Sequence, residues 1–131
     1  MTAPLCEIAR MVVVAALCVP AFVAWAAEPL TCSAANSAEA IRVLRAKIRS
    51  ERLYVSWAKE QCLEFYPEHC DPMKVDIAIR ELHTEECGGA PQTGPVVDRF
   101  RVYRKSKNIN WYDVVNDEYL EFSKVHSMGK R

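Results

Sequence analysis

The distribution of apolar side chains predicts one amphipathic helix near the start of the globular part of the chain. In residues 36–51, "NSAEAIRVLRAKIRSE", four apolar side chains fall within about 100° of arc on a 3.6-residue helix. These four are Ala40, Ile41, Leu44 and Ile48. Asn36 is the expected N-cap, and Glu39, three residues later, would complete a capping box. One side of this helix should therefore be wet and the other should lie on a sheet.

The next clear pattern is a strand. In residues 74–82, "KVDIAIREL", apolar and polar side chains alternate, so Asp76 and Arg80 occupy the face opposite the apolar one. The apolar face carries Val75, Ile77 and Ile79.

A hairpin follows. Two alternating segments, 96–104 and 109–115, are separated by the polar turn "KSKN" at 105–108. In the first segment, one face is predicted to carry Val96, Phe100 and Val102, and the other Arg99, Arg101 and Tyr103.

The remaining segments are less decisive. The pattern over residues 53–66 fits either helix or strand, with a strand favoured for 62–66. Two prolines predict a loop over 67–72, "PEHCDP". Residues 117–131 are amphiphilic and end in a polar tail that is expected to fray.

These elements predict an α+β fold. One N-terminal helix should pack on a small curved antiparallel sheet of three to five strands, stabilised by disulfides.

The N-terminus reads as an export signal. Residues 11–26 form a continuous apolar run that ends in Ala24-Trp25-Ala26, with small residues where a signal peptidase cuts. As a helix the run would span roughly 24 Å, less than the ~30 Å hydrocarbon core of a bilayer. We therefore expect a signal peptide at 1–26 and a single small domain at 27–131, located in the periplasm or secreted. A retained membrane anchor is the alternative, but no stable membrane insertion is expected after cleavage.

Four cysteines remain in the expected mature chain, namely Cys32, Cys62, Cys70 and Cys87. An even number in an exported chain favours disulfides, and three connectivities are possible. Antiparallel pairing of 62–66 with 75–83 would bring Cys62 close to Cys87. That favours the bridge Cys62–Cys87 and leaves Cys32–Cys70.

Charge and motif searches exclude several activities. The chain carries 17 basic and 17 acidic residues, so no net field attracts it to nucleic acid. Metal-ligand residue types occur without paired ligand spacing, and oxidised cysteines do not bind metal. They are His69, Cys70, Asp71, His83 and Cys87. Neither a metal nor any other cofactor is expected.

The segment "CGGAPQTGP", residues 87–95, is not a phosphate-binding loop, because no Lys-Ser or Lys-Thr and no helix follow it. Its glycines permit positive φ and its prolines stiffen the chain, which predicts a rigid structural turn. The residues of this turn are Gly88, Gly89, Pro91, Gly94 and Pro95.

Two groups of residues are candidates for a partner surface. Four arginines lie within ~80° of arc on the predicted helix, where they either meet a partner or cover the edge of the apolar face. They are Arg42, Arg45, Arg49 and Arg52. Three aromatic residues, Trp57, Trp111 and Tyr112, are possible contact anchors. Trp111 and Tyr112 would face opposite sides of a strand, so one ring should be exposed.

The stretch from His83 to Val115, with "CGGAPQTGP", "FRV" and "WYD", resembles small, largely uncharacterised exported proteins of Gram-negative bacteria. Their pattern runs C-G-G-D-P-x-T-x-P, then F-R-V, then an aromatic-Asp pair. The similarity covers about a third of the expected mature chain, and Ala90 stands where that pattern has Asp. It implies bacterial export and a strand–turn–strand layout, but no reaction.

The resulting hypothesis is a small exported, periplasmic binding module whose partner is another exported protein, for example as an inhibitor or immunity-type protein. One alternative is a small hydrolase-like enzyme that uses His83 with Cys87 or Glu85. Another is a structural accessory of the cell envelope.

Overall fold

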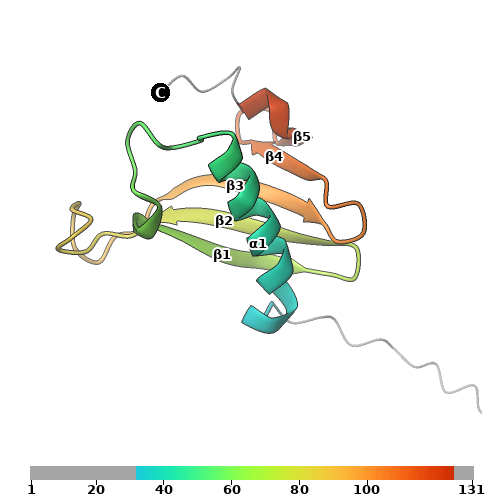
Figure 1. Cartoon of the computed structure of the whole chain (residues 1–131), viewed down its shortest axis with the longest axis horizontal. Helices are drawn as coiled ribbons and strands as arrows, with labels where there is room; N and C mark the ends of the chain where they lie inside the picture. Colours follow the sequence, from blue (N-terminus) through green and yellow to red (C-terminus); the bar gives the residue numbers. More distant parts are fainter. Residues whose placement is uncertain (1–31, 126–131) are drawn as a thin grey trace, which may run out of the picture.

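The computed structural model describes residues 32–125, in which one helix lies across one face of a five-stranded antiparallel sheet (Figure 1). Each strand pairs with its neighbour in sequence, in the order β1-β2-β3-β4-β5. The elements are α1 (Ala34–Ser50), η1 (Glu60–Cys62), β1 (Leu63–Cys70), β2 (Lys74–Glu81), β3 (Val96–Tyr103), β4 (Ile109–Asp113), β5 (Glu118–Glu121) and η2 (Phe122–Lys124). The α+β prediction is confirmed, whereas the predicted signal peptide and frayed tail lie outside the described residues.

The core lies between α1 and the sheet. Leu44 of α1 is fully buried, as is the predicted apolar face of β2. Phe100 and Val102 of β3 are buried beside them, as the hairpin pattern predicted.

The helix begins earlier than predicted. Ser33, not Asn36, is the N-cap, and its Oγ accepts a hydrogen bond from the Asn36 backbone N–H at 3.2 Å. Serine is as good a cap as asparagine, and the two alanines that follow it favour helix, so one more turn forms. Glu39 makes an ion pair with Lys107 at 2.7 Å.

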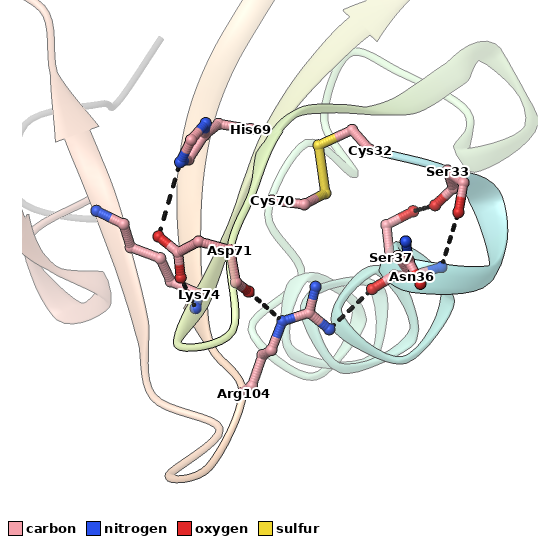
Figure 2. Close-up of a disulfide and its surroundings, with 9 residues drawn as sticks. All are labelled: Cys32, Ser33, Asn36, Ser37, His69, Cys70, Asp71, Lys74 and Arg104. Carbon is pink, nitrogen blue, oxygen red and sulfur yellow. Dashed lines mark hydrogen bonds and ion pairs between the residues drawn. A yellow bond between two sulfur atoms is a disulfide. The ribbon is translucent and has the colours of Figure 1, made fainter. Parts of the chain in front are cut away.

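The start of α1 is fastened to the sheet by one disulfide and one arginine (Figure 2). The bridge Cys32–Cys70 joins the residue before the N-cap of the helix to the end of β1. The guanidinium of Arg104 donates from Nε to the Asp71 carbonyl at 2.7 Å and from Nη1 to the Asn36 carbonyl at 2.8 Å. A single side chain thus ties the β1–β2 turn to the helix.

Strand β1 is longer than predicted. The proposed strand at 62–66 is real, but it continues through Pro67 to Cys70, where the sequence predicted a loop. The register shifts between Pro67 and His69, which marks a β-bulge. Proline is tolerated there because β1 is an edge strand of this sheet.

Residues 53–57 form neither helix nor strand. The backbone turns at Arg52 and Tyr54, whose φ angles of 54° and 72° are left-handed. Because α1 has already ended at Ser50, Arg52 does not extend the arginine stripe of the helix.

A second bulge corrects the predicted face of β3. The register with β2 shifts between Ile79 and Arg80, whose partners are Asp98 and Val96. Val97, not Val96, consequently packs against the core.

The C-terminal segment forms a strand and a short helix that its amphiphilic pattern did not predict. Strand β4 ends at Asp113, two residues before the predicted end, and β5 pairs with it antiparallel. In η2, the ring of Phe122 lies 5.7 Å from that of Phe100, between ring centroids. Residues 118–124 therefore complete both the sheet and the core.

The carboxylate of Asp98 connects three parts of the fold. It accepts a hydrogen bond from the Tyr54 hydroxyl at 2.6 Å and another from the Trp111 indole N–H at 2.8 Å. Burial, and then the nearby Asp98 carboxylate, raise the pKa of Tyr54. The α1–β1 connection, β3 and β4 are joined through this one side chain.

Replacing Asp98→Ala should lower the free energy of unfolding by about 1–3 kcal/mol, because two shielded donors lose their acceptor. Denaturant unfolding followed by circular dichroism measures this. Glu85→Ala, which removes an exposed carboxylate, should stay within about 0.5 kcal/mol of wild type. Equal stability of Asp98→Ala and wild type would contradict the linking role.

Candidate functional site

The topology gathers three connections at one end of the sheet, called here the loop end: residues 51–59, 82–95 and 114–117. In an up-and-down antiparallel sheet, the β2–β3 and β4–β5 connections lie at the end where β1 begins. The segment that follows α1 reaches the same end, as Figure 1 shows.

Most exposed apolar side chains of the described chain lie on the loop end. Six large apolar side chains are exposed within residues 32–125, and four of them belong to these connections. They are Val55 (60% exposed), Trp57 (45%), Val114 (72%) and Val115 (83%). A surface of this kind is typical of a site that a partner covers.

The 82–95 connection is tied to η1 by one disulfide and one backbone hydrogen bond. The bridge Cys62–Cys87 ties its middle to η1, so both disulfides have the pairing that the sequence favoured. The backbone N–H of Leu82 also donates to the Cys62 carbonyl at 2.8 Å. A bridge of this size stabilises a small domain by about 2–4 kcal/mol.

The His83 ring links the start of the same connection to its later residues by hydrogen bonds. Its Nε2 lies 2.9 Å from a Glu81 carboxylate oxygen, and its Nδ1 lies 3.1 Å from the Ala90 carbonyl and 2.6 Å from Thr93 Oγ1. A carboxylate and a carbonyl only accept, so this arrangement suits a ring protonated on both nitrogens. The Glu81 hydrogen bond and the Ala90 carbonyl accordingly raise the pKa of His83.

This geometry bears on the enzymatic alternative. Cys87 is in a disulfide and has no thiol, so its predicted partnership with His83 is wrong. Glu85 is exposed, and no hydrogen bond or ion pair joins it to His83 among the described contacts. The Thr93 hydroxyl donates to the Ala90 carbonyl at 2.8 Å, so its proton is engaged by that carbonyl.

The glycine pair explains how the turn fits around His83. Gly88 and Gly89 have φ angles of 75° and 87°, as the rigid-turn prediction requires. A Cβ on Gly89 would lie 2.5 Å from the His83 ring, whereas one on Gly88 would meet nothing within 4 Å. Pro91 and Pro95 are exposed and complete the turn with Gly94.

The β4–β5 turn is rigid despite its exposed valines. The carboxylate of Asp113, 1% exposed, accepts from the Val115 N–H at 3.0 Å and from Asn116 Nδ2 at 2.7 Å. These hydrogen bonds, that of Asn116 first, lower the pKa of Asp113. From the strand that leads into the turn, the Tyr112 hydroxyl donates to Asp117 at 2.5 Å.

A groove of about 290 Å³ separates the first two connections of the loop end. Trp57 and Lys59 line one side, and Glu86, Cys87 and the glycine pair line the other. Its charged rim carries both signs, so shape and apolar contact, not net charge, distinguish it.

The predicted partner residues do not form one surface. Trp111 faces the core and donates to Asp98, Tyr112 faces the other side of the sheet, and both are half-buried, so neither ring is freely exposed. Trp57 belongs to the loop end, where its ring lies 5.5 Å from that of Tyr54, between ring centroids.

Two of the helical arginines contact side chains of this chain. Arg49 makes two hydrogen bonds with Glu60, and Arg45 lies 3.6 Å from the same carboxylate and 4.3 Å above the Phe65 ring. Arg49 contributes most to lowering the pKa of Glu60. Arg42 is exposed. The stripe therefore covers the edge of the core.

Sequence reasoning found only part of the face of the sheet that points away from α1, called here the open face: it placed residues of β2 and β3 there, but none of β1 or β5. Its side chains alternate with the core-facing ones and are mostly tyrosines, arginines and carboxylates. They include Glu64, Tyr66, Glu68, Asp76, Ala78, Arg80, Arg99, Arg101, Tyr103, Tyr112 and Tyr119. The rest was missed because the strand at 62–66 was predicted to end in a loop and no strand was predicted at 118–121.

The open face is ordered by ion pairs and ring contacts. Arg101 makes two hydrogen bonds with Asp76 at 2.7 and 2.9 Å, and its guanidinium lies 3.8 Å above the Tyr119 ring. Arg99 pairs with Glu68 at 3.0 Å.

No family model, curated protein or solved structure matches this chain. Within residues 32–125, no group of three or more metal-ligand residue types is close enough to hold an ion. None of the helices in that range is both long and apolar enough to cross a bilayer. The two disulfides indicate an oxidising, extracellular-type environment.

The His83 contacts predict a pH-dependent stability. Because the folded-state pKa is raised, the contribution is complete below the unfolded value of about 6.5 and is lost as pH rises through the folded value. Wild type should exceed His83→Gln in unfolding free energy at low pH, and the difference should shrink at alkaline pH. Glu81→Gln should reduce this dependence in the same way. A difference that does not change with pH would contradict the protonated arrangement.

The glycine pair offers a matched comparison. Alanine at either position must adopt a left-handed backbone, which costs of order 1–3 kcal/mol. Gly89→Ala should cost more than Gly88→Ala, because only the former meets the His83 ring. Thermal unfolding of both variants measures the difference, and equal losses would show that His83 yields without cost.

Proposed function

We propose that this protein is a small exported, periplasmic binding module that engages another exported protein through its loop end. The observation that carries the proposal is the combination of exposed apolar side chains with connections that are individually braced. Val114 and Val115 are the most exposed of these side chains, and they stand on a turn fixed by a buried carboxylate.

The bracing matters because binding normally costs the entropy of ordering loops and side chains. The Cys62–Cys87 bridge, the His83 contacts and the Asp113 hydrogen bonds order the loop end before any partner arrives. Burying each exposed valine would then contribute about 1.5–3 kcal/mol. A disordered loop would lose much of that gain.

The form of the loop end favours a partner with an apolar depression. The β4–β5 turn presents two adjacent β-branched side chains, and Trp57 borders a groove that accepts a side chain in return. Inhibitor- and immunity-type proteins that block an exported enzyme use surfaces of this kind, which is the class we favour. The N-terminal apolar run and the two disulfides support export.

Loss of the apolar side chains should weaken partner binding. The partner is first identified by crosslinking to the exported protein in a periplasmic extract, then purified. The double variant Val114→Ser/Val115→Ser and the single variant Trp57→Ala should each weaken its binding by about tenfold or more.

The matched control is Arg42→Ala, an exposed helical residue away from the loop end, which should bind as wild type does. Each variant's thermal unfolding is recorded to confirm the fold. Undiminished binding by both loop-end variants would refute the proposed surface.

A further inference from the structure

Three arginines lie on the open face. Two of them are paired with a carboxylate, and the third is not. Arg99 and Arg101 are each paired with a carboxylate, from Glu68 and Asp76 respectively. Arg80 lies 4.3 Å above the Tyr66 ring, and within residues 32–125 no carboxylate is within ion-pair distance of it. Its Nε is buried without a hydrogen-bond acceptor.

From this we infer that Arg80 and Tyr66 form a recognition site for a carboxylate side chain, Asp or Glu, on a protein segment that docks on the open face. This site is separate from the loop end and does not depend on the function proposed for it.

The ring contact prepares the arginine for this role. A guanidinium stacked on an aromatic ring can still offer its two terminal Nη groups for paired hydrogen bonds to a carboxylate. Because Tyr66 already fixes the side chain, less rotamer entropy remains to be lost on binding. Tyr66 itself is 44% exposed, so it offers an apolar wall beside the charge. Arginine and tyrosine are also the residue types enriched at binding hot spots.

The neighbouring charges favour an acidic side chain over a polyanion. Glu64 is the direct cross-strand neighbour of Arg80, and Glu68 lies further along the same strand. A single carboxylate reaches Arg80 past Glu64, whereas a run of phosphates would be repelled by Glu64 and would find Arg99 and Arg101 already paired with carboxylates. Glu64 is exposed and unpaired in the described contacts, so it is the competitor inside the chain for the same guanidinium.

The probe is a phage-displayed library of random peptides selected on the immobilised, exported protein. Selected peptides should be enriched in Asp and Glu. Fluorescence anisotropy of one such peptide should show about tenfold or more weakening with Arg80→Gln, because a charge-assisted hydrogen-bond pair is lost.

Four further variants sharpen the test. Glu64→Gln should strengthen binding by removing the internal competitor, and Arg80→Lys should bind less tightly than wild type because lysine lacks the planar fork. The control Arg42→Gln, on the helix, and the loop-end variant Trp57→Ala should leave peptide affinity unchanged. Thermal unfolding shows whether each variant remains folded.

Three results would overturn the site: peptides without acidic enrichment, peptide affinity indifferent to Arg80→Gln, or single-stranded DNA binding that Arg80→Gln abolishes while acidic peptides fail. Loss of peptide binding in Trp57→Ala with none in Arg80→Gln would place acidic recognition at the loop end instead. Failure of the loop-end proposal leaves this test untouched, because the two sites use different residues.

Discussion

The fold depends on one helix having to cover one face of a five-stranded sheet. A helix is about 10–12 Å across, whereas five strands spaced at ~4.8 Å span roughly 20 Å. The segments that flank the sheet must therefore complete the core, and both do. Leu53, Tyr54 and Ala58 pack in from the α1–β1 connection, and Phe122 and Val125 from the chain after β5. What reads as a linker is thus part of the packing.

Because α1 is narrower than the sheet, the segments that complete the core also determine which surfaces stay exposed. The connections of the loop end are held in place by core residues or by hydrogen bonds. Their outward-facing side chains therefore project from an ordered backbone. Asp98 shows the principle, since its two hydrogen bonds hold the connection that bears Trp57 against β3 and β4. Within residues 32–125 no second layer covers the open face, and its arginines are ordered instead by carboxylates and rings. Rigidity and exposure coexist on both surfaces.

Sequence patterns identified the parts whose environment is simple. Strand β2 and the β3–β4 hairpin alternate cleanly because one side is core and the other solvent. The patterns failed where pairing decides the outcome: Val97 turns inward only because of a bulge, and Pro67 lies in a strand only because β1 is at an edge. Of the candidate site, the disulfide pairing and the rigid turn were within reach. Glu81 and His83, two apart at a strand end, also carried a usable signal, whereas the Arg80–Tyr66 contact required the β1–β2 register.

The two disulfides are interleaved along the chain, since Cys62 lies inside the loop closed by Cys32–Cys70 and Cys87 lies outside it. An oxidant that joined cysteines in the order of their synthesis would make Cys32–Cys62 and Cys70–Cys87, neither of which is native. Correct oxidation therefore has to wait until β1 and β2 have paired, or wrong bridges have to be exchanged afterwards. The native pair of bridges thus depends either on the β1–β2 pairing that precedes oxidation or on thiol–disulfide exchange that follows it.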